Sequence, residues 1–503
     1  MDWPRIFRGS SLGWFLLIWG TPWSHAAMSL GVAWTGFVAV KICIRQPSKR
    51  QLTRPLKWLG LMLLWLTASL AWTENLTWGL RLLGLQWPLW VLLAAWHVSP
   101  LGTDDGQTAR RWVMGSAMLA MSGALAWGSL QWLQGHPLEG REWSPWMSHI
   151  RLSLFAALAM GWNAKVGSGK ELGLFGLVWG GFTLATGSLT SVMLVPLTLG
   201  WVLFQRSAPG QRPIVLSIGL VGTLVVAMVM GHWLRPVPLP HDGLPSHTAW
   251  GNPYVHQPER VLSEGGHRLH VLMCEKEWAE AWRQVSQKSL DEQNASGYSI
   301  RPRLLRYLTS KGWPKDGEHI VQLSPIEVQA IEQGATNVRP RSGLSQRLHA
   351  FRWEYETWQD GGDPSGHSLF QRLEHWQAGW HAWNESLLWG DGIGDAEASI
   401  QRSYLALDTP LSETFRHRAH MQYLTLGMTG GCMALALWLA FALSWSWRFR
   451  DHAVAQWSGL LVALSFLFED TLETQAGVVV VGLAFALGSH AFSTSARHSR
   501  RTS

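Results

Sequence analysis

Apolar residues are concentrated in two regions of the chain, and a polar region separates them. Residues 10–235 and 420–492 are strongly apolar, whereas residues 236–419 are polar and charged. A helix needs about 20 consecutive apolar residues to cross the core of a bilayer. The pattern therefore predicts a membrane protein with about twelve spanning helices. They cover residues 11–24, 27–44, 58–73, 80–97, 112–134, 150–163, 171–187, 190–205, 213–234, 419–443, 454–469 and 476–492.

The positions of lysine and arginine predict how these helices are oriented. Nineteen lie in the two termini and in the connections of one side, whereas the short connections of the other side hold three, namely Arg81, Arg141 and Arg151. Positively charged loops remain on the cytoplasmic side of a membrane. We therefore expect both termini in the cytoplasm and residues 236–419 outside it. In a bacterium this means a multi-pass protein of the inner membrane with a periplasmic loop domain.

The polar segment 236–419 is predicted to be a mainly helical domain. It is too polar to span a membrane and too rich in Trp, Leu and Tyr to be disordered. Ser324 followed by Pro325 is typical of a helix start, and no convincing strand is expected. Leu and Trp recur every three or four residues around Arg372, which lies beside this apolar stripe and is thereby directed towards a cleft. The expected helices cover residues 270–288, 325–333, 344–358 and 367–388.

The fold class predicted from these patterns is all-α, in a polytopic membrane protein with one large loop domain. About nine helices lie before this domain and about three after it. The predicted parts are an N-terminal transmembrane bundle over residues 1–235, the periplasmic domain over 236–419, C-terminal transmembrane helices over 420–492 and a basic cytoplasmic tail over 493–503.

Composition adds two constraints. The 503 residues include 35 Trp and only 6 Tyr, and many of the Trp lie near the ends of predicted spans, as interfacial belts do. The formal charge of +7 lies mainly in short loops, so it does not indicate a nucleic-acid partner. Cys43, Cys274 and Cys432 fall in places that offer no plausible pair, so no disulfide framework is expected.

The predicted topology gathers ionisable residues at the outer face, among them His420. An imidazole there is suited to general-base catalysis, because its ordinary pKa is close to neutral. The alternative is a histidine that only bonds a backbone group where a helix begins. His417 and His420 lack a third ligand at a suitable spacing, so no metal site is expected.

Two outer arginines, Arg151 and Arg372, are suited to bind a phosphate group through two parallel hydrogen bonds. Alternatively, Arg151 extends to lipid head groups and Arg372 is a solvated helix charge. Glu469, Asp470 and Glu473 form a short acidic turn at the same face. They either orient His420 or the arginines, or are an ordinary acidic loop.

Several short motifs, in their order along the chain, resemble the O-antigen ligase and polymerase superfamily. They are Ser148-His-Ile-Arg151, Arg372 with Trp376, Gly390-Asp-Gly-Ile-Gly394, and His420-Met-Gln-Tyr-Leu424 with Gly430. The branch typical of Bacteroidota is the most similar one. Its further likenesses are Arg306-Tyr-Leu-Thr-Ser-Lys-Gly312, Gly366-His-Ser-Leu-Phe-Gln-Arg372 and Glu469-Asp-Thr-Leu-Glu-Thr-Gln475.

This resemblance implies a membrane glycosyltransferase that moves a glycan from an undecaprenyl-diphosphate carrier to an acceptor hydroxyl, such as one on lipid A core. It implies an inverting, O-antigen ligase-like reaction on the periplasmic face, without metal, nucleotide or other cofactor. His420 would match the catalytic histidine, and Arg151 and Arg372 the arginines that hold the diphosphate. Two positions depart from the family pattern. Members often have Asn where this chain has Met421, and Arg where it has Leu189.

Other residues near these positions are also expected to contact the substrate: His149, Trp376, Glu469, Asp470, Glu473 and Gln422. Within the same superfamily, an O-antigen polymerase and a protein O-oligosaccharyltransferase are alternatives. A transporter of lipid or glycan is the alternative from another class. Transporters usually place ionisable residues near the middle of the bilayer, whereas the predicted spans here are nearly free of charge.

Overall fold

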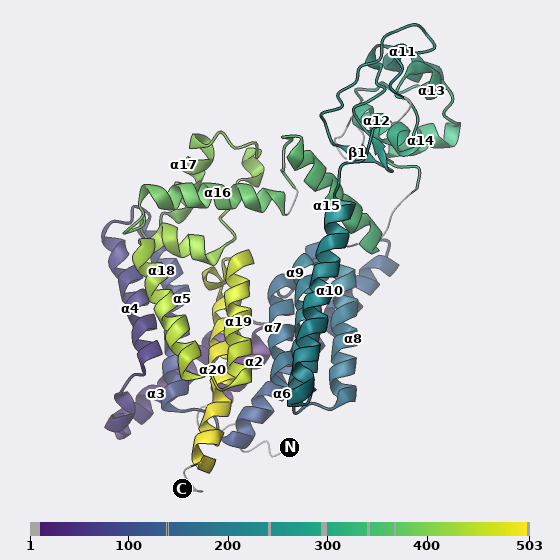
Figure 1. Cartoon of the computed structure of the whole chain (residues 1–503). Coiled ribbons are helices and arrows are strands. Elements are labelled where there is room, and N and C mark those ends of the chain that lie inside the picture. The colour runs from purple at the N-terminus through teal and green to yellow at the C-terminus, as the bar shows by residue number, and fades with distance from the viewer. Residues whose placement is uncertain are drawn as a thin grey trace. The chain divides into compact units, whose positions relative to one another are not determined.

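The structure is a computed structural model, and it describes residues 11–136, 138, 140–239, 243–292, 299–339, 343–366 and 369–499. The protein is mostly helical (Figure 1). Each of the twelve apolar segments expected from the sequence coincides with a helix. These are α2 (Ser11–Gly20), α3 (His25–Arg45), α4 (Arg54–Ala68), α5 (Leu76–Val98), α6 (Thr103–Leu133), α7 (His149–Trp162), α8 (Gly169–Thr186), α9 (Leu189–Arg206), α10 (Arg212–Trp233), α18 (Gln422–Arg448), α19 (Ala453–Phe468) and α20 (Gln475–Ser499).

Among the described residues, five helices are long and apolar enough to cross a membrane. They are α3, α6 from Asp105, α9, α10 with the short turn before it, and α18. The expected count of about twelve spans is therefore not reached on length and composition. For α4 and α7 the physical reason is length, because they have 15 and 14 residues. At about 1.5 Å per residue, both are shorter than a hydrocarbon core of about 30 Å.

The chain divides into two compact units. The bundle unit comprises Met1–Leu220, Arg372–Thr409 and Arg416–Ser503, and the loop unit comprises Val221–Gln371 and Pro410–Phe415. The predicted loop segment, residues 236–419, thus contributes to both. In the bundle unit, α16 (Phe370–Glu385) runs crosswise to α18 and α19, and α17 (Ala396–Ala406) follows it (Figure 1).

Helix α7 is the most deeply buried element of the bundle unit. All residues from Leu152 to Trp162 are buried. The indole N–H of Trp457 donates to the carbonyl of Ala157 at 3.1 Å, and a side chain at Gly161 would collide with the same indole. This close packing fixes α7 in the centre of the unit, so the position of its first turn is fixed as well.

Helix α18 is interrupted in its middle, at Gly430 and Gly431, where the backbone is not helical. A loop after α16 replaces the lost pairing. The N–H of Asp391 donates to Met428 O at 2.8 Å, and the N–H of Cys432 donates to Leu387 O at 2.8 Å. Gly390 has a φ of +69°, and a Cβ there would lie 2.6 Å from the nitrogens of both interrupting glycines. Residues 387–392, which follow α16, therefore supply backbone partners for the interrupted turn of α18.

The loop unit has its own core, formed by Trp278, Trp282, Leu304 and Ile331 among others. Its helix α14 begins as predicted, because Ser324 caps it in a reciprocal pair with Glu327. The helices of this unit are α11 (Glu275–Val285), α12 (Ile300–Ser310), α13 (Gly317–Val321), α14 (Pro325–Gln333) and α15 (Gly343–Gln359).

The expectation that this part of the chain has no strands was wrong. A short antiparallel hairpin pairs β1 (Ser263–Glu264) with β2 (His267–Arg268). Gly265 and Gly266 form its turn with φ values of +63° and +91°. Two consecutive residues with positive φ make the tight turn that matches the twist of a hairpin, and glycine adopts this conformation without strain.

Candidate functional site

Two arginines and one glutamate from three separate helices meet in the bundle unit. Arg151 lies in the first turn of α7, Arg372 in the first turn of α16, and Glu469 directly after α19. An Nη2 of Arg151 lies 3.8 Å from one carboxylate oxygen of Glu469, and an Nη2 of Arg372 lies 3.9 Å from the other. The two guanidinium groups predicted to bind a diphosphate are thus held on either side of one carboxylate.

The two contacts between Glu469 and these arginines are ion pairs without the geometry of strong hydrogen bonds. A charge-assisted N–H···O bond spans about 2.7–2.9 Å, and both distances here are longer. The three side chains retain 21%, 22% and 15% of their exposure. Two positive charges face one negative charge, so the cluster carries a net positive charge and attracts a further anion.

Arg151 and two other predicted site residues, Trp376 and Gln422, carry buried donor atoms. Arg151 Nε, Trp376 Nε1 and Gln422 Nε2 are buried atoms without a hydrogen-bond partner among the described residues. Trp376 follows Arg372 by one helical turn, so both lie on one side of α16. A buried donor without a partner costs about 1–3 kcal/mol. Such a set of donors is suited to a ligand that is rich in acceptor oxygens.

Gln422 and His149 occupy the first residues of two helices beside this cluster. The side-chain oxygen of Gln422 accepts the N–H of Leu472 at 2.7 Å, which orients the amide. His149 is the first residue of α7 and is half-buried. Both therefore lie at the N-terminal ends of helices, and their contact with a substrate stays a prediction.

His420 lies just before α18 in a conformation that is unusual for its type. Its φ is +49°, in the left-handed region that favours glycine. Such backbone strain costs about 1–3 kcal/mol and is concentrated at functional sites. Asp470 holds this conformation, because one carboxylate oxygen accepts the N–H of His420 at 3.2 Å and the other accepts the hydroxyl of Thr425 at 2.7 Å.

The acidic turn therefore has three distinct roles. Glu469 pairs with the arginines, and Asp470 binds the backbone at His420. Glu473 pairs with Arg418 at 2.6 Å, and burial and the nearby Asp470 carboxylate raise the pKa of Glu473. A cavity of about 20 Å³ beside Arg418 and Glu473 has room for one water but not for a sugar.

Sequence reasoning missed a buried histidine that lies against His420. The ring centroids of His375 and His420 are 5.6 Å apart, and that of His417 is 6.1 Å from His375. The His375 side chain is 1% exposed. Its only sequence signal is its place three residues after Arg372, on the same side of α16. Within the described residues, no group of three or more His, Cys, Asp or Glu side chains is arranged to hold a metal.

The hydrogen bonds of His375 determine which of its nitrogens carries the proton. The Tyr404 hydroxyl donates to the carbonyl of His417 at 2.8 Å, so its oxygen must accept from His375 Nδ1 at 2.5 Å. Burial, and then the positive charges of His420, His417 and Arg372, lower the pKa of His375 to about 3. His375 is therefore neutral near pH 7, with its proton on Nδ1 and a lone pair on Nε2.

Comparison with known proteins does not assign the chain to a group. No protein-family model matches it, and no curated protein matches it. The resemblance to O-antigen ligases and polymerases rests on the ordered motifs alone, and it stays a prediction.

Proposed function

We propose that this protein transfers a glycan from a polyprenyl-diphosphate carrier to an acceptor hydroxyl, as a member of the O-antigen ligase and polymerase superfamily. The single observation that carries the proposal is the cluster of Arg151, Glu469 and Arg372, with its net positive charge. In the proposal, both termini are cytoplasmic and the reaction takes place at the periplasmic face of a bacterial inner membrane. Membrane lipids surround the spans, and lipid A core or another glycan is the acceptor.

The arginine cluster is suited to receive a diphosphate. A diphosphate carries more negative charge than the carboxylate of Glu469, so it competes for Arg151 and Arg372. Planar guanidinium groups bind phosphate oxygens in pairs, and the buried donors on Arg151, Trp376 and Gln422 then gain acceptors. Negative charge grows on the diphosphate as it leaves, and stabilising such charge is usually a large part of catalysis.

His420 supplies the base in this mechanism. It accepts the proton of the acceptor hydroxyl while the hydroxyl oxygen attacks the anomeric carbon of the sugar. The bond between that carbon and the carrier diphosphate breaks as the glycosidic bond forms, so the anomeric configuration inverts and the carrier diphosphate departs. His375 supports this role, because a neutral neighbour adds no positive charge that would weaken the base.

In vitro transfer from a lipid-diphosphate donor tests the proposal directly. The purified protein in lipid should convert a labelled polyprenyl-diphosphate glycan into a product on an added acceptor. The same preparation should bind the donor, and inorganic diphosphate at micromolar concentrations should compete with the donor for binding. A preparation that inserts correctly, binds no diphosphate and transfers nothing would contradict the proposal.

A deletion strain identifies the acceptor. Loss of the lipopolysaccharide ladder with polymer remaining on the carrier means a ligase, and bands with a single repeat mean a polymerase. An unchanged ladder with loss of glycan from a protein means a protein O-oligosaccharyltransferase. A strain in which no glycan changes contradicts the proposed function.

A further inference from the structure

The loop unit contains a cavity of about 450 Å³ that none of the preceding roles uses. It lies between the end of α10, the turn of the β1–β2 hairpin and helix α15. Cavities of about 300–1,000 Å³ with apolar walls and a few polar groups are typical of small-ligand sites. This one is large enough for two or three sugar rings.

The walls of the cavity combine flat apolar surfaces with positive charge. Trp233, Trp353 and Leu348 supply apolar surface, and His349 and Arg352 supply polar groups. The Arg306 guanidinium lies 3.8 Å from the Trp353 ring and covers part of it. No carboxylate is among the residues that line the cavity within the described part of the chain.

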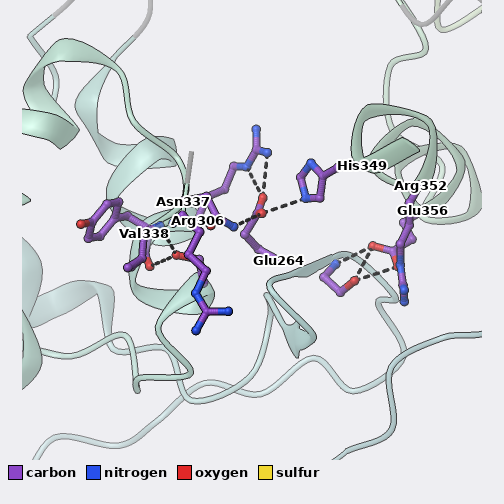
Figure 2. A network of polar contacts seen from close by, with 11 residues as sticks. Glu264, Arg306, Asn337, Val338, His349, Arg352 and Glu356 are labelled. Atoms are coloured by element: carbon purple, nitrogen blue, oxygen red, sulfur yellow. Dashed lines mark hydrogen bonds and ion pairs between the residues drawn. The ribbon is translucent and has the colours of Figure 1, made fainter. Parts of the chain in front are cut away.

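Two glutamates lie behind this wall, and their charges are already neutralised (Figure 2). Glu264 accepts from Arg306 at 2.7 and 3.0 Å and from Asn337 at 2.7 Å, and it pairs with His349 at 2.8 Å. Glu356 accepts from Arg352 Nε at 2.8 Å and from Ser263. These bonds fix the side chains of His349 and Arg352 beside the cavity before any ligand arrives, so little conformational entropy is lost on binding.

We propose that this cavity binds an acidic oligosaccharide, through the stacking of sugar rings on its indoles and the pairing of a sugar carboxylate with Arg352. A pyranose ring has one face of C–H groups, which packs on an indole, and a rim of hydroxyls, which needs hydrogen bonds. Glu356 and the carbonyl of Arg235 occupy Nε and Nη2 of Arg352, so its Nη1 group is the donor that meets the sugar carboxylate. The inference rests on the proposed function, for which it supplies a site that holds the glycan chain.

The nearest rival occupant is the anionic head group of a lipid, because Trp233 ends a candidate membrane span. The lining argues for the sugar. A head-group site gathers several cations around one phosphate, whereas the described lining residues of this cavity include one arginine and one histidine, and most of the others are aromatic or small.

Saturation-transfer NMR on the full-length protein in detergent tests the inference. The probes are tetragalacturonic acid and a sialic acid tetramer, with maltotetraose as the neutral comparison. At least one acidic probe should bind more tightly than maltotetraose. Arg352→Lys keeps the charge but loses the planar fork, so it should weaken the acidic probe about tenfold and the neutral one less.

Two substitutions that fill the cavity, Leu348→Trp and Ser345→Trp, should each abolish binding. Ile326→Trp is the matched control, because it adds the same side chain to the same unit at a position that is 80% exposed and outside the cavity. Each variant is first checked for native elution and helix content. The use of two filling positions protects the test against the misfolding of one of them.

Three outcomes overturn the inference: no binding of either acidic probe, binding that both filling substitutions leave unchanged, or displacement of the sugar by lysophosphatidylglycerol at equal concentration. The proposed transfer is judged separately. His420→Ala should bind the acidic probe like the wild type while its rate of transfer falls about 10²–10⁴-fold. Binding by a wild-type protein that transfers nothing would contradict the proposed function and support the cavity assignment.

Discussion

Glu264 in the loop unit and Glu469 in the bundle unit are both glutamates flanked by arginine, yet their surroundings differ. Glu264 is completely buried and its oxygens are occupied at 2.7–3.0 Å by Arg306, Asn337 and His349. Glu469 is partly exposed, and its two arginines lie at 3.8 and 3.9 Å. The close bonds of Glu264 stabilise the fold, whereas the longer pairs between Glu469 and its two arginines are, in the proposed function, replaced by pairs with another anion.

The two sites also differ in whether their hydrogen-bond donors and acceptors are paired. Around Glu264, donors and acceptors are matched, and this supports a rigid wall. In the bundle unit, three buried donors on Arg151, Trp376 and Gln422 have no hydrogen-bond partner among the described residues, and His420 is held in a strained backbone conformation. Unpaired buried donors and a strained backbone both cost free energy of folding. Such costs are expected at a site where a ligand supplies the missing hydrogen-bond partners.

The largest expected effect concerns His420. His420→Ala should lower the rate of in vitro transfer by about 10²–10⁴-fold, the usual contribution of a positioned base, with diphosphate binding retained. His417→Ala is the control, because the His417 ring is exposed and lies beside both His375 and His420. Transfer by His420→Ala at the wild-type rate would refute the catalytic role.

Removal of the carboxylate charge should destabilise the protein at Glu264 but not at Glu469. Glu264→Gln leaves Arg306 without its charge partner, and breaking a buried pair costs about 3–5 kcal/mol. The loop unit should therefore exchange its amide hydrogens much faster. Glu469→Gln should change exchange in the bundle unit little. Equal loss of protection in both variants would mean that Glu469 is structural as well.

A smaller effect is expected for the arginines. Arg372→Lys keeps the charge but loses the paired hydrogen bonds, worth about 1.5–3 kcal/mol, so transfer should fall about 10- to 100-fold. Arg402→Lys is a matched control, since this arginine lies on the next helix, α17, but is 59% exposed and pairs with Asp391. The measurement is kcat/KM for the donor in both variants. A loss that is equal in Arg372→Lys and Arg402→Lys would contradict the role of Arg372.

The smallest effect is a difference in acid sensitivity. Burial lowers the pKa of His375 to about 3 in the folded protein. In the unfolded chain His375 binds a proton at higher pH, so the bundle unit should lose stability as pH falls below about 6.5. Burial raises the pKa of Glu264, but His349 and Arg306 outweigh it and lower the pKa to about 2. The stability that Glu264 supplies is therefore lost only below about pH 4.5.

Hydrogen exchange, corrected for its intrinsic pH dependence, separates these two windows. Peptides around His375 should lose protection between about pH 6.5 and 4, before those around Glu264. His375→Gln removes the titrating group and keeps a donor for Tyr404, so it should flatten the response of the bundle unit alone. The same response with and without His375 would disprove this cause.

Local patterns were enough to predict most helices and one cap. The apolar runs gave all twelve of their helices, and Ser324 before Pro325 gave the start of α14, because both signals depend on neighbouring residues. The hairpin was missed because two residues per strand show no alternation. The Gly-Gly pair at 265–266 was its only signal.

Tertiary contacts account for what the sequence left open at the site. Arg151, Arg372 and Glu469 were expected at one face, but nothing local indicates that one carboxylate bridges both arginines. The same holds for Asp470, which binds the backbone of His420 rather than its ring. His375 lies outside the stripe of Leu and Trp on α16, on the side of the helix where Ala378 and Ala382 are buried, and its burial depends on what packs there.

The interruption of α18 has a consequence for how the protein is made. The backbone groups that complete the broken turn belong to residues 387–392, which leave the ribosome before residues 428–432. The partners of the open turn are therefore already synthesised when α18 enters the bilayer, where an unpaired backbone group costs several kcal/mol. With the reverse order of segments, the helix would have to enter the lipid with those groups exposed. The order of the chain thus protects an insertion step that a broken helix would otherwise make difficult.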